Sequence, residues 1–313
     1  MLPIGIVGPG AIGGLLSSQF VRAGYPVVLV GRDEDWLRRV RREGLRILGK
    51  EFGDRRVRPG KKLRVTLAPS GPPCAAVFIC VKSADTAGAL KTAAPLIGPS
   101  TAIIGLQNGL AHPGLYRRAF GERRTIFGAS LIASERPNRL TMRHHGGREI
   151  LLSRHAGNET CLRVASRLLA RSGWKTRALA SRDHLLWTKA AFNAAVNPLG
   201  ALTGRTNGEL ARIPALREVL LRLLRETTTL ARRDGRAPLR FSRLKSQILH
   251  GCRAAPGQPN SMLQDVRAGR RTEVDAIVAP FLRIARRRGI PAPTLESIHR
   301  FVKRLERELR RKT

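Results

Sequence analysis

Residues 4–14 read Ile-Gly-Ile-Val-Gly-Pro-Gly-Ala-Ile-Gly-Gly, and this stretch decides the fold of the chain. A short apolar run leads directly into the pattern Gly-x-Gly-x-x-Gly. An apolar helical stretch follows over residues 15–23, Gly24 ends it, and residues 26–30 form a second apolar run. Strand, glycine turn, helix and strand in this order predict the first βαβ unit of a dinucleotide-binding fold.

Each glycine of the pattern has its own expected role. Gly8 permits a tight turn, Gly10 lets the backbone approach a pyrophosphate, and Gly13 lets the helix pack against the strand. The pyrophosphate is expected at the helix N-terminus, where unpaired N–H groups and the helix dipole favour anions. The predicted cofactor-binding residues of the turn are Gly8, Pro9, Gly10, Ala11, Ile12 and Gly13.

The end of the second apolar run indicates which dinucleotide binds. NAD enzymes usually carry Asp or Glu there, bonded to the ribose 2′-hydroxyl, whereas this chain has Gly31 and Arg32. A guanidinium fits a 2′-phosphate, so NADPH is favoured over NADH. The alternative interpretation is that Arg32 is one more surface arginine.

Polar residues also follow two later strands, predicted at 75–81 and 102–106. The first is followed by Lys82 and the second by Asn108. Ligands of open α/β sheets lie beyond the carboxyl ends of the strands, so both side chains are expected at the cofactor groove, although helix capping is an alternative for each. Strands at 125–133, 139–144, 148–153 and 174–179 and a helix at 157–172 are expected to complete this layer.

Helical patterns fill the rest of the chain, and we expect helices at 182–203, 206–211, 214–234, 240–251, 260–289 and 294–311. The predicted fold class is therefore α/β, with an N-terminal Rossmann-type dinucleotide-binding domain (1–179) followed by an all-α domain (180–313).

The first of these helices carries a polar stripe on an otherwise apolar surface. Lys189, Asn193 and Asn197 are spaced i, i+4, i+8 and share one helix face among alanine, phenylalanine and valine. Buried polar groups need partners, so either other protein groups or a ligand must satisfy the stripe. Two later polar residues have simpler interpretations: Ser261 as a helix N-cap, and Glu273 as a surface acid paired with an arginine.

The composition narrows the class of protein. The net charge is +36, and the 58 basic residues comprise 48 Arg and 10 Lys. The arginines are spread along the chain and no nucleic-acid-binding motif is visible, so we expect no specific nucleic-acid partner. We expect no membrane span, because no run of 18 apolar residues occurs. We also expect no signal peptide, because the N-terminus shows no charged n-region and no cleavage site, and we therefore expect a cytoplasmic protein. The four cysteines lack metal-ligand spacing, so no metal site is expected.

Taken together, the motifs make the chain similar to the ketopantoate reductase (2-dehydropantoate 2-reductase) family over essentially its whole length. The motifs that carry the resemblance, in order, are Gly8-x-Gly10-x-x-Gly13, Lys82, Gln107-Asn108-Gly109, Lys189-x3-Asn193-x3-Asn197-Pro198, Asn207-Gly208-Glu209-Leu210, and Ser261 to Asp265 with Thr272-Glu273-x-Asp275. The resemblance implies an NADPH-binding Rossmann domain, an all-α domain, an active site in the cleft between them, and reduction of 2-dehydropantoate to (R)-pantoate on the way to pantothenate and coenzyme A.

The resemblance also implies residue roles. Lys189 is the implied general acid, and Glu273 lies beside it and the nicotinamide ribose. Asn108 positions substrate and nicotinamide, while Lys82 and Arg32 contact the cofactor. The implied substrate-binding residues are Asn193, Asn197, Asn207, Ser261 and Asn108.

Two other functions remain open at this stage. A reductase of the same fold acting on a different small-molecule 2-oxo acid would differ only in pocket shape. A non-catalytic protein that binds NADP or nucleic acid would keep the Rossmann domain alone. The sequence leaves the oligomeric state open, with a homodimer as one option.

Overall fold

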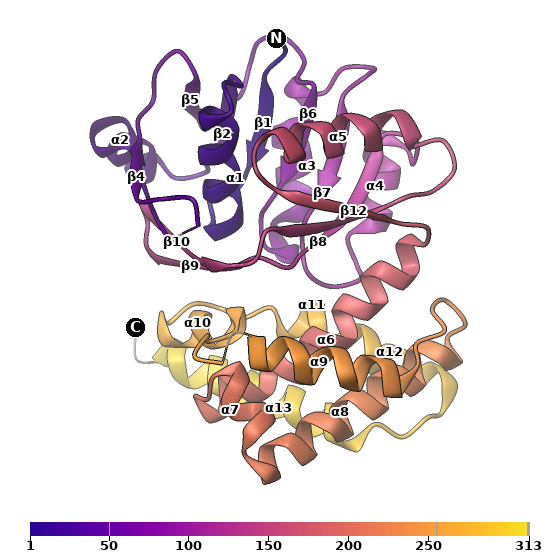
Figure 1. Cartoon of the computed structure of the whole chain (residues 1–313). Helices are drawn as coiled ribbons and strands as arrows, with labels where there is room; N and C mark the ends of the chain where they lie inside the picture. The colour runs from indigo at the N-terminus through magenta and orange to yellow at the C-terminus, as the bar shows by residue number, and fades with distance from the viewer. Residues whose placement is uncertain (50, 255, 312–313) are drawn as a thin grey trace. The chain divides into compact units, whose positions relative to one another are not determined.

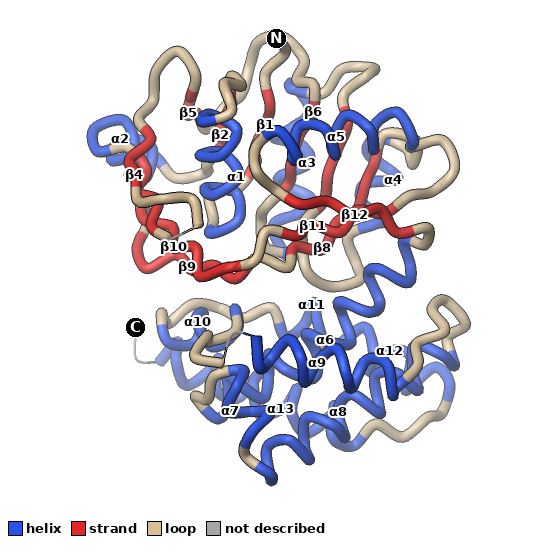
Figure 2. Tube along the Cα trace, in the orientation of Figure 1, coloured by secondary structure: helices blue, strands red, loops and turns tan. Residues whose placement is uncertain are grey.

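A computed structural model describes residues 1–49, 51–254 and 256–311 of the chain. The chain divides into two compact units. The first comprises residues 1–107 and 112–182, and the second comprises residues 108–111 and 183–313. Every strand of the described residues belongs to the first unit, whereas the second unit is helical (Figures 1 and 2).

An eight-stranded sheet forms the centre of the first unit. Its strands, in spatial order, are β12 (Lys175–Leu179), β11 (Glu149–Ser153), β8 (Thr125–Ser130), β7 (Ala102–Gly105), β6 (Ala76–Ile79), β1 (Ile4–Val7), β2 (Val27–Val30) and β5 (Leu63–Thr66). β1 pairs in parallel with β2 on one side and with β6 on the other. The strand order therefore reverses between β1 and β6, which is the switch point where open α/β sheets bind ligands.

Five α-helices accompany the sheets in the described part of this unit: α1 (Ala11–Arg22), α2 (Glu34–Glu43), α3 (Thr86–Ala93), α4 (Pro113–Phe120) and α5 (Glu159–Arg171). α2 starts with the acidic residues Glu34 and Asp35, and Asp33 caps it by accepting a hydrogen bond from the Trp36 backbone N–H. Strands β1, β2, β6 and β7 are buried along their full lengths, as continuous apolar runs require.

A second sheet corrects the expectation of a single layer. The strand expected at 125–133 ends at Ser130, and a separate four-stranded sheet follows, in the order β4 (Arg55–Val57), β3 (Leu45–Leu48), β10 (Thr141–Gly146) and β9 (Ala133–Asn138). The Met142 side chain of β10 lies over Gly14 of α1, where a Cβ atom would stand 2.4 Å from the methionine methyl group. The strand expected at 139–144 therefore packs over α1 rather than joining the central sheet.

The second unit contains eight helices among its described residues: α6 (Arg182–Thr203), α7 (Asn207–Arg212), α8 (Pro214–Arg233), α9 (Phe241–Ala254), α10 (Ser261–Arg267), α11 (Val274–Ile277), α12 (Ala279–Arg288) and α13 (Pro293–Arg311). Their buried faces consist mainly of leucine and alanine, including five alanines of α6. None of the described helices is long and apolar enough to cross a membrane.

The expectation of one continuous helix over residues 260–289 is wrong, because three helices occupy this range. Gly269, with φ +62°, follows α10 in a left-handed conformation that glycine adopts at little cost. Pro280 lies in the first turn of α12, where its missing N–H costs no helical hydrogen bond. These two residues break the helical pattern, and the segment between α10 and α11 carries Glu273.

Candidate functional site

The glycine turn follows β1 at the switch point of the sheet. Gly8 has φ +102°, and a Cβ atom there would lie 2.8 Å from the Val81 side chain and 2.9 Å from the Cys80 carbonyl carbon. Only glycine fits both restrictions. The turn therefore contacts Cys80 and Val81, the two residues between the end of β6 and Lys82 in the sequence.

Gly10 and Gly13 are glycines for different reasons. A Cβ on Gly13 would lie 2.1 Å from the Gly8 carbonyl oxygen, so the helix could not pack this closely with a larger residue. A Cβ on Gly10 would find nothing nearer than the Cys80 carbonyl oxygen at 3.9 Å. Gly10 precedes α1 and caps it without a side chain. The space at Gly10 and the start of α1 fits an approaching phosphate group.

The remaining residues of the glycine turn have their contacts within the first unit. The Pro9 carbonyl oxygen accepts a hydrogen bond from the Arg136 guanidinium at 3.3 Å. Ala11 and Ile12 form the first turn of α1. Cys80 lies beneath the turn, and burial raises the pKa of its thiol to about 12, so it stays protonated.

Arg32 lies at the end of β2, as expected, and is tied to the loop that follows β6. Its Nη1 atom donates to Asp85 Oδ1 at 2.6 Å, with the two side chains 79% and 38% exposed. Asp85 ends the short 3₁₀ helix Ser83–Asp85, and Lys82 immediately precedes that helix. Arg32 and Lys82 therefore belong to two loops joined by one exposed ion pair at the carboxyl ends of β2 and β6.

The sequence missed a buried tyrosine that holds the end of β7. Tyr116 donates its hydroxyl hydrogen to Gln107 Oε1 at 2.9 Å, and Gln107 Nε2 donates to Thr86 Oγ1 at 3.3 Å. All three side chains are buried. The sequence offers only a general reason to expect this contact, namely that a buried tyrosine hydroxyl needs a hydrogen-bond partner. This chain of bonds fixes the residue immediately before Asn108.

In the second unit, three of the predicted site residues form one hydrogen-bonded chain. Asn193 Nδ2 donates to Asn108 Oδ1 at 3.0 Å, and Asn108 Nδ2 donates to Glu273 Oε2 at 3.1 Å. The Asn193 side chain is buried. Glu273 Oε2 accepts from the amide nitrogen of Asn108, so the amide oxygen of Asn108 is turned toward Asn193.

Asn197 and Ser261 meet one helical turn further along α6. Asn197 Nδ2 lies 3.4 Å from Ser261 Oγ, a long hydrogen bond. The interpretation of Ser261 as an N-cap is wrong, because Asn260 occupies that position and its Oδ1 accepts from the Leu263 backbone N–H at 3.0 Å. Ser261 is the first residue of α10, and its hydroxyl is left to interact with Asn197.

Asn260 also links Asn207 to this region. Its Nδ2 atom donates to the Val196 carbonyl oxygen at 3.3 Å and lies 3.5 Å from Asn207 Oδ1. Sequence reasoning did not single out Asn260, although asparagine before a helix is a strong N-cap signal. Asn260, a buried residue that caps α10, thus contacts Asn207 and the backbone immediately before Asn197, and both asparagines are predicted to bind substrate.

Lys189 is the ionisable residue of the polar stripe on α6, and its pKa is shifted. Burial lowers its pKa from 10.5 to about 8, because the ammonium form loses hydration. Its Nζ atom lies 5.6 Å from the centroid of the Phe192 ring. A lysine with this pKa remains mostly protonated at neutral pH and gives up its proton more readily than an exposed lysine. Among the described residues, no group of three His, Cys, Asp or Glu side chains is arranged to hold a metal ion.

The first unit has a mostly parallel sheet with a glycine turn at its switch point, and the helical unit has a partly buried lysine beside buried asparagines. Together these features define a Rossmann-fold protein of two units. Residues 4–157 match the family model of ketopantoate reductase PanE/ApbA, and residues 183–306 match the model of the C-terminal part of the same family. The chain belongs to the ketopantoate reductase family of oxidoreductases, which confirms the family and the fold class predicted from the motifs.

Individual relatives agree with this assignment along the whole chain. A 2-dehydropantoate 2-reductase of Halobacterium salinarum is 28% identical over 304 residues, covering 97% of this chain and 98% of the relative. A PanE/ApbA family ketopantoate reductase from Ralstonia eutropha JMP134 superimposes with a TM-score of 0.85 at 25% identity, covering 99% and 100% of the two chains. A D-mandelate dehydrogenase with NADH and anilino(oxo)acetate has a TM-score of 0.90 at 18% identity over 99% of each chain, a likeness of fold alone.

Proposed function

We propose that this protein reduces 2-dehydropantoate to (R)-pantoate with NADPH, a step toward pantothenate. The observation that carries the proposal is the partly buried Lys189, with a pKa near 8, on the same helix face as Asn193 and Asn197. The relative from Halobacterium salinarum, a 2-dehydropantoate 2-reductase matched from end to end, supports this substrate. We assign cofactor binding to residues 1–179 and substrate binding to residues 180–313, with Asn108 as a contributor to both.

The residues of the glycine turn fit a dinucleotide. The open space beside Gly10 and the N-terminus of α1 suit the pyrophosphate. Arg32 and Lys82 supply positive charge for the 2′-phosphate and neighbouring groups. When bound, the reduced nicotinamide supplies a hydride to the substrate carbonyl carbon. Every other role in the reaction falls to side chains of this chain.

Lys189 is the proposed proton donor. Hydride addition to a ketone carbon leaves negative charge on the oxygen, which a nearby ammonium stabilises. Lys189 Nζ then gives its proton to that oxygen, forming the alcohol. An arginine could not replace it, because a guanidinium does not lose its proton in proteins. The low pKa of Lys189 brings its proton affinity closer to working pH, where acid catalysis is most effective.

The asparagines and Ser261 are the proposed substrate-binding groups. Asn193, Asn197 and Asn207 offer amide N–H donors for the substrate carboxylate and acceptors for its hydroxyl, and Ser261 adds one hydroxyl. Asn193 bonds Asn108 and Asn197 bonds Ser261, and we expect a bound substrate to exchange places with these partners. Glu273 holds the amide of Asn108 in one orientation for this exchange.

A steady-state assay tests the proposal directly. The purified chain is supplied with NADPH and either 2-dehydropantoate or other branched 2-oxo acids, and the loss of reduced nicotinamide is followed by absorbance. We expect the highest kcat/KM with 2-dehydropantoate and a higher kcat/KM with NADPH than with NADH. A different preferred 2-oxo acid would overturn the substrate, and equal use of both cofactors would overturn the role of Arg32.

One observation favours a second candidate substrate class. The D-mandelate dehydrogenase that shares this fold contains NADH and anilino(oxo)acetate, an aromatic 2-oxo acid analogue. The second candidate is therefore an NADH-dependent reductase of aromatic 2-oxo acids. The same assay separates the two, since this candidate requires an aromatic 2-oxo acid to exceed 2-dehydropantoate in kcat/KM.

A further inference from the structure

A recess of about 480 Å³ lies in the second unit, between the C-terminal half of α8 and the start of α9. Its walls include Arg225, Thr229, Arg232, Arg240, Phe241 and Ser242. No acidic residue lines it. None of these residues belongs to the proposed reductase site, so the recess is a separate feature of the helical unit.

The spacing along α8 places the basic groups together. Arg225 and Arg232 are seven residues apart, with Thr229 between them, so all three share one face of the helix. Arg240 precedes α9 on the other wall. The guanidinium of Arg225 lies 4.9 Å from the centroid of the Phe241 ring, and this contact restricts its motion. Three guanidinium groups therefore surround one recess.

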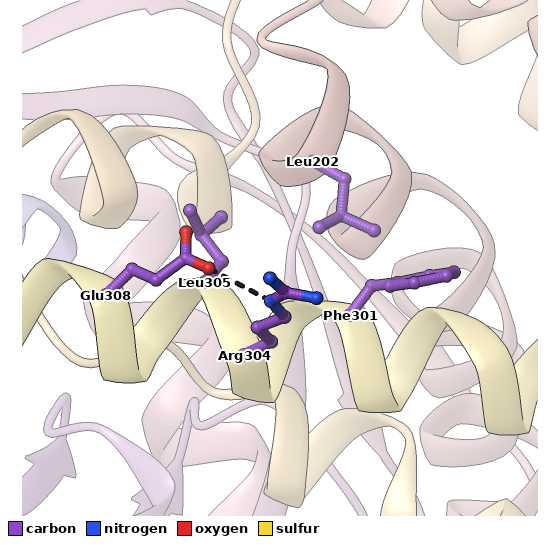
Figure 3. A pocket seen from close by; sticks show the side chains of 5 residues that line it. All are labelled: Leu202, Phe301, Arg304, Leu305 and Glu308. Atoms are coloured by element: carbon purple, nitrogen blue, oxygen red, sulfur yellow. Dashed lines mark hydrogen bonds and ion pairs between the residues drawn. The ribbon is translucent and has the colours of Figure 1, made fainter.

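These three arginines lack carboxylate partners in the part of the chain that the structure describes. Pairing is not general in this unit: Arg222 pairs with Glu218 on α8, and Arg304 pairs with Glu308 in the smaller recess along α13 (Figure 3). Arg283, Arg286 and Arg288 of α12, like the recess arginines, form no ion pair among the described residues. What distinguishes Arg225, Arg232 and Arg240 is that they line one recess, where unneutralised charges of one sign repel each other and a bound anion relieves the repulsion.

The nearest acidic side chains on α8 and at its end have other partners. Asp234 pairs with Arg236 and Arg287. Glu226 accepts hydrogen bonds from the backbone N–H groups of Thr294 and Leu295, at 3.0 and 2.8 Å. Neither carboxylate lines the recess. These carboxylates therefore do not neutralise the positive charge of the recess, which is available to bind an anion from solution.

We propose that this recess binds a small anion with two or more phosphate charges. Guanidinium groups form paired hydrogen bonds with phosphate oxygens, and the hydroxyls of Thr229 and Ser242 add single donors. The volume suits a small molecule, whereas a nucleic acid would contact an extended face rather than one recess. The bound phosphate groups would lie between α8 and the first turn of α9.

Inorganic pyrophosphate is the probe, titrated calorimetrically into the full chain at physiological ionic strength. The pocket variant is Arg225→Gln/Arg232→Gln/Arg240→Gln. The matched control is Arg283→Gln/Arg286→Gln/Arg288→Gln, which removes the same charge from three exposed arginines of the same unit that line neither recess. We expect at least a 10-fold loss of affinity in the pocket variant and less than a 2-fold change in the control.

A local readout separates this site from the glycine turn, which also fits pyrophosphate. Hydrogen exchange of the peptides covering residues 225–242 should slow on addition of pyrophosphate in the wild type and in the control, but not in the pocket variant. Equal losses of affinity in both variants would mean that only the diffuse surface charge binds the probe, and the proposal would fall. It would also fall if the pocket variant lost affinity for a DNA duplex but not for pyrophosphate.

Discussion

The Glu306 carboxylate accepts two hydrogen bonds from Thr272, one from its backbone N–H at 2.8 Å and one from its hydroxyl at 2.7 Å. Glu306 lies on α13 with only 4% of its surface exposed, and Lys303 lies 3.1 Å from its other oxygen. The bonds join the C-terminal helix to the segment between α10 and α11. They therefore hold the residue that immediately precedes Glu273.

Glu306→Ala should destabilise the second unit by about 3 kcal/mol. The substitution leaves two buried donors of Thr272 without an acceptor, and unmade buried hydrogen bonds are costly. The free energy of unfolding in urea measures the loss. Glu308→Ala on the same helix is the control, because it removes an exposed ion pair with Arg304, which contributes only about 0–1 kcal/mol. Equal effects of the two substitutions would contradict the importance of the Thr272 contact.

Low pH should reduce the stability that the Glu306 contacts give to the second unit. Burial raises the pKa of Glu306, but hydrogen bonds from Thr272 and Lys303 outweigh it and hold that pKa below its ordinary value. Burial likewise raises the pKa of Asp275, and hydrogen bonds from Lys303 and His299 lower it by more. Such groups stabilise the fold fully above their unfolded pKa, and the contribution is lost as pH falls through the folded pKa. We expect the difference in unfolding free energy between wild type and Glu306→Gln to shrink as pH falls below about 4.5. A difference that stayed constant with pH would contradict the pKa shift of Glu306.

Two glycines of the turn should respond differently to alanine. Gly13→Ala places a Cβ against the Gly8 carbonyl oxygen, so the first unit should lose stability and dinucleotide binding together. Gly10→Ala meets nothing within 3.9 Å and should fold normally, yet bind NADPH at least 10-fold more weakly because the methyl group occupies the phosphate position. Thermal unfolding and NADPH fluorescence titration measure the two properties. Unchanged NADPH binding in folded Gly10→Ala would place the pyrophosphate elsewhere.

Lys189→Ala should lower kcat by roughly two to four orders of magnitude, the usual range for a positioned proton donor. NADPH affinity should change much less. In the wild type, the reduction rate should fall as pH rises through about 8, because Lys189 must carry its proton to donate it. Lys189→Arg is the control for charge, and it should stay slow since arginine keeps its proton. Activity near wild type in Lys189→Ala would exclude this lysine as the acid.

Arg32→Ala should weaken NADPH binding far more than NADH binding, because only NADPH carries the 2′-phosphate. The matched control is Arg38→Ala on α2, another exposed arginine with carboxylate neighbours in the same unit. The control should leave the ratio of the two dissociation constants unchanged. If Arg32→Ala weakened both cofactors equally, Arg32 would not belong to the phosphate site.

Much of the fold was predictable because its signals are local. The glycine turn, the buried strands and the long helix α6 each follow from a pattern within a few residues. The extra sheet was missed because β3 and β4 are only three to four residues long and both include arginine, so neither forms a continuous apolar run. The broken helix at 260–289 was missed because apolar residues recur at helical spacing on both sides of the polar stretch 269–273, and a single glycine or proline within such a pattern does not fix where a helix ends.

The sequence by itself determined that a Gly-x-Gly-x-x-Gly turn follows the first strand and that Lys189, Asn193 and Asn197 share one helix face. Only the tertiary structure decided what those side chains meet. Asn108 bonds Asn193 across 85 residues and Glu273 across 165, and Asn260 rather than Ser261 caps α10. The physical reason is that the periodicity of apolar residues indicates which face of a helix or strand is buried, whereas the packing of distant segments determines which hydrogen-bond partners meet.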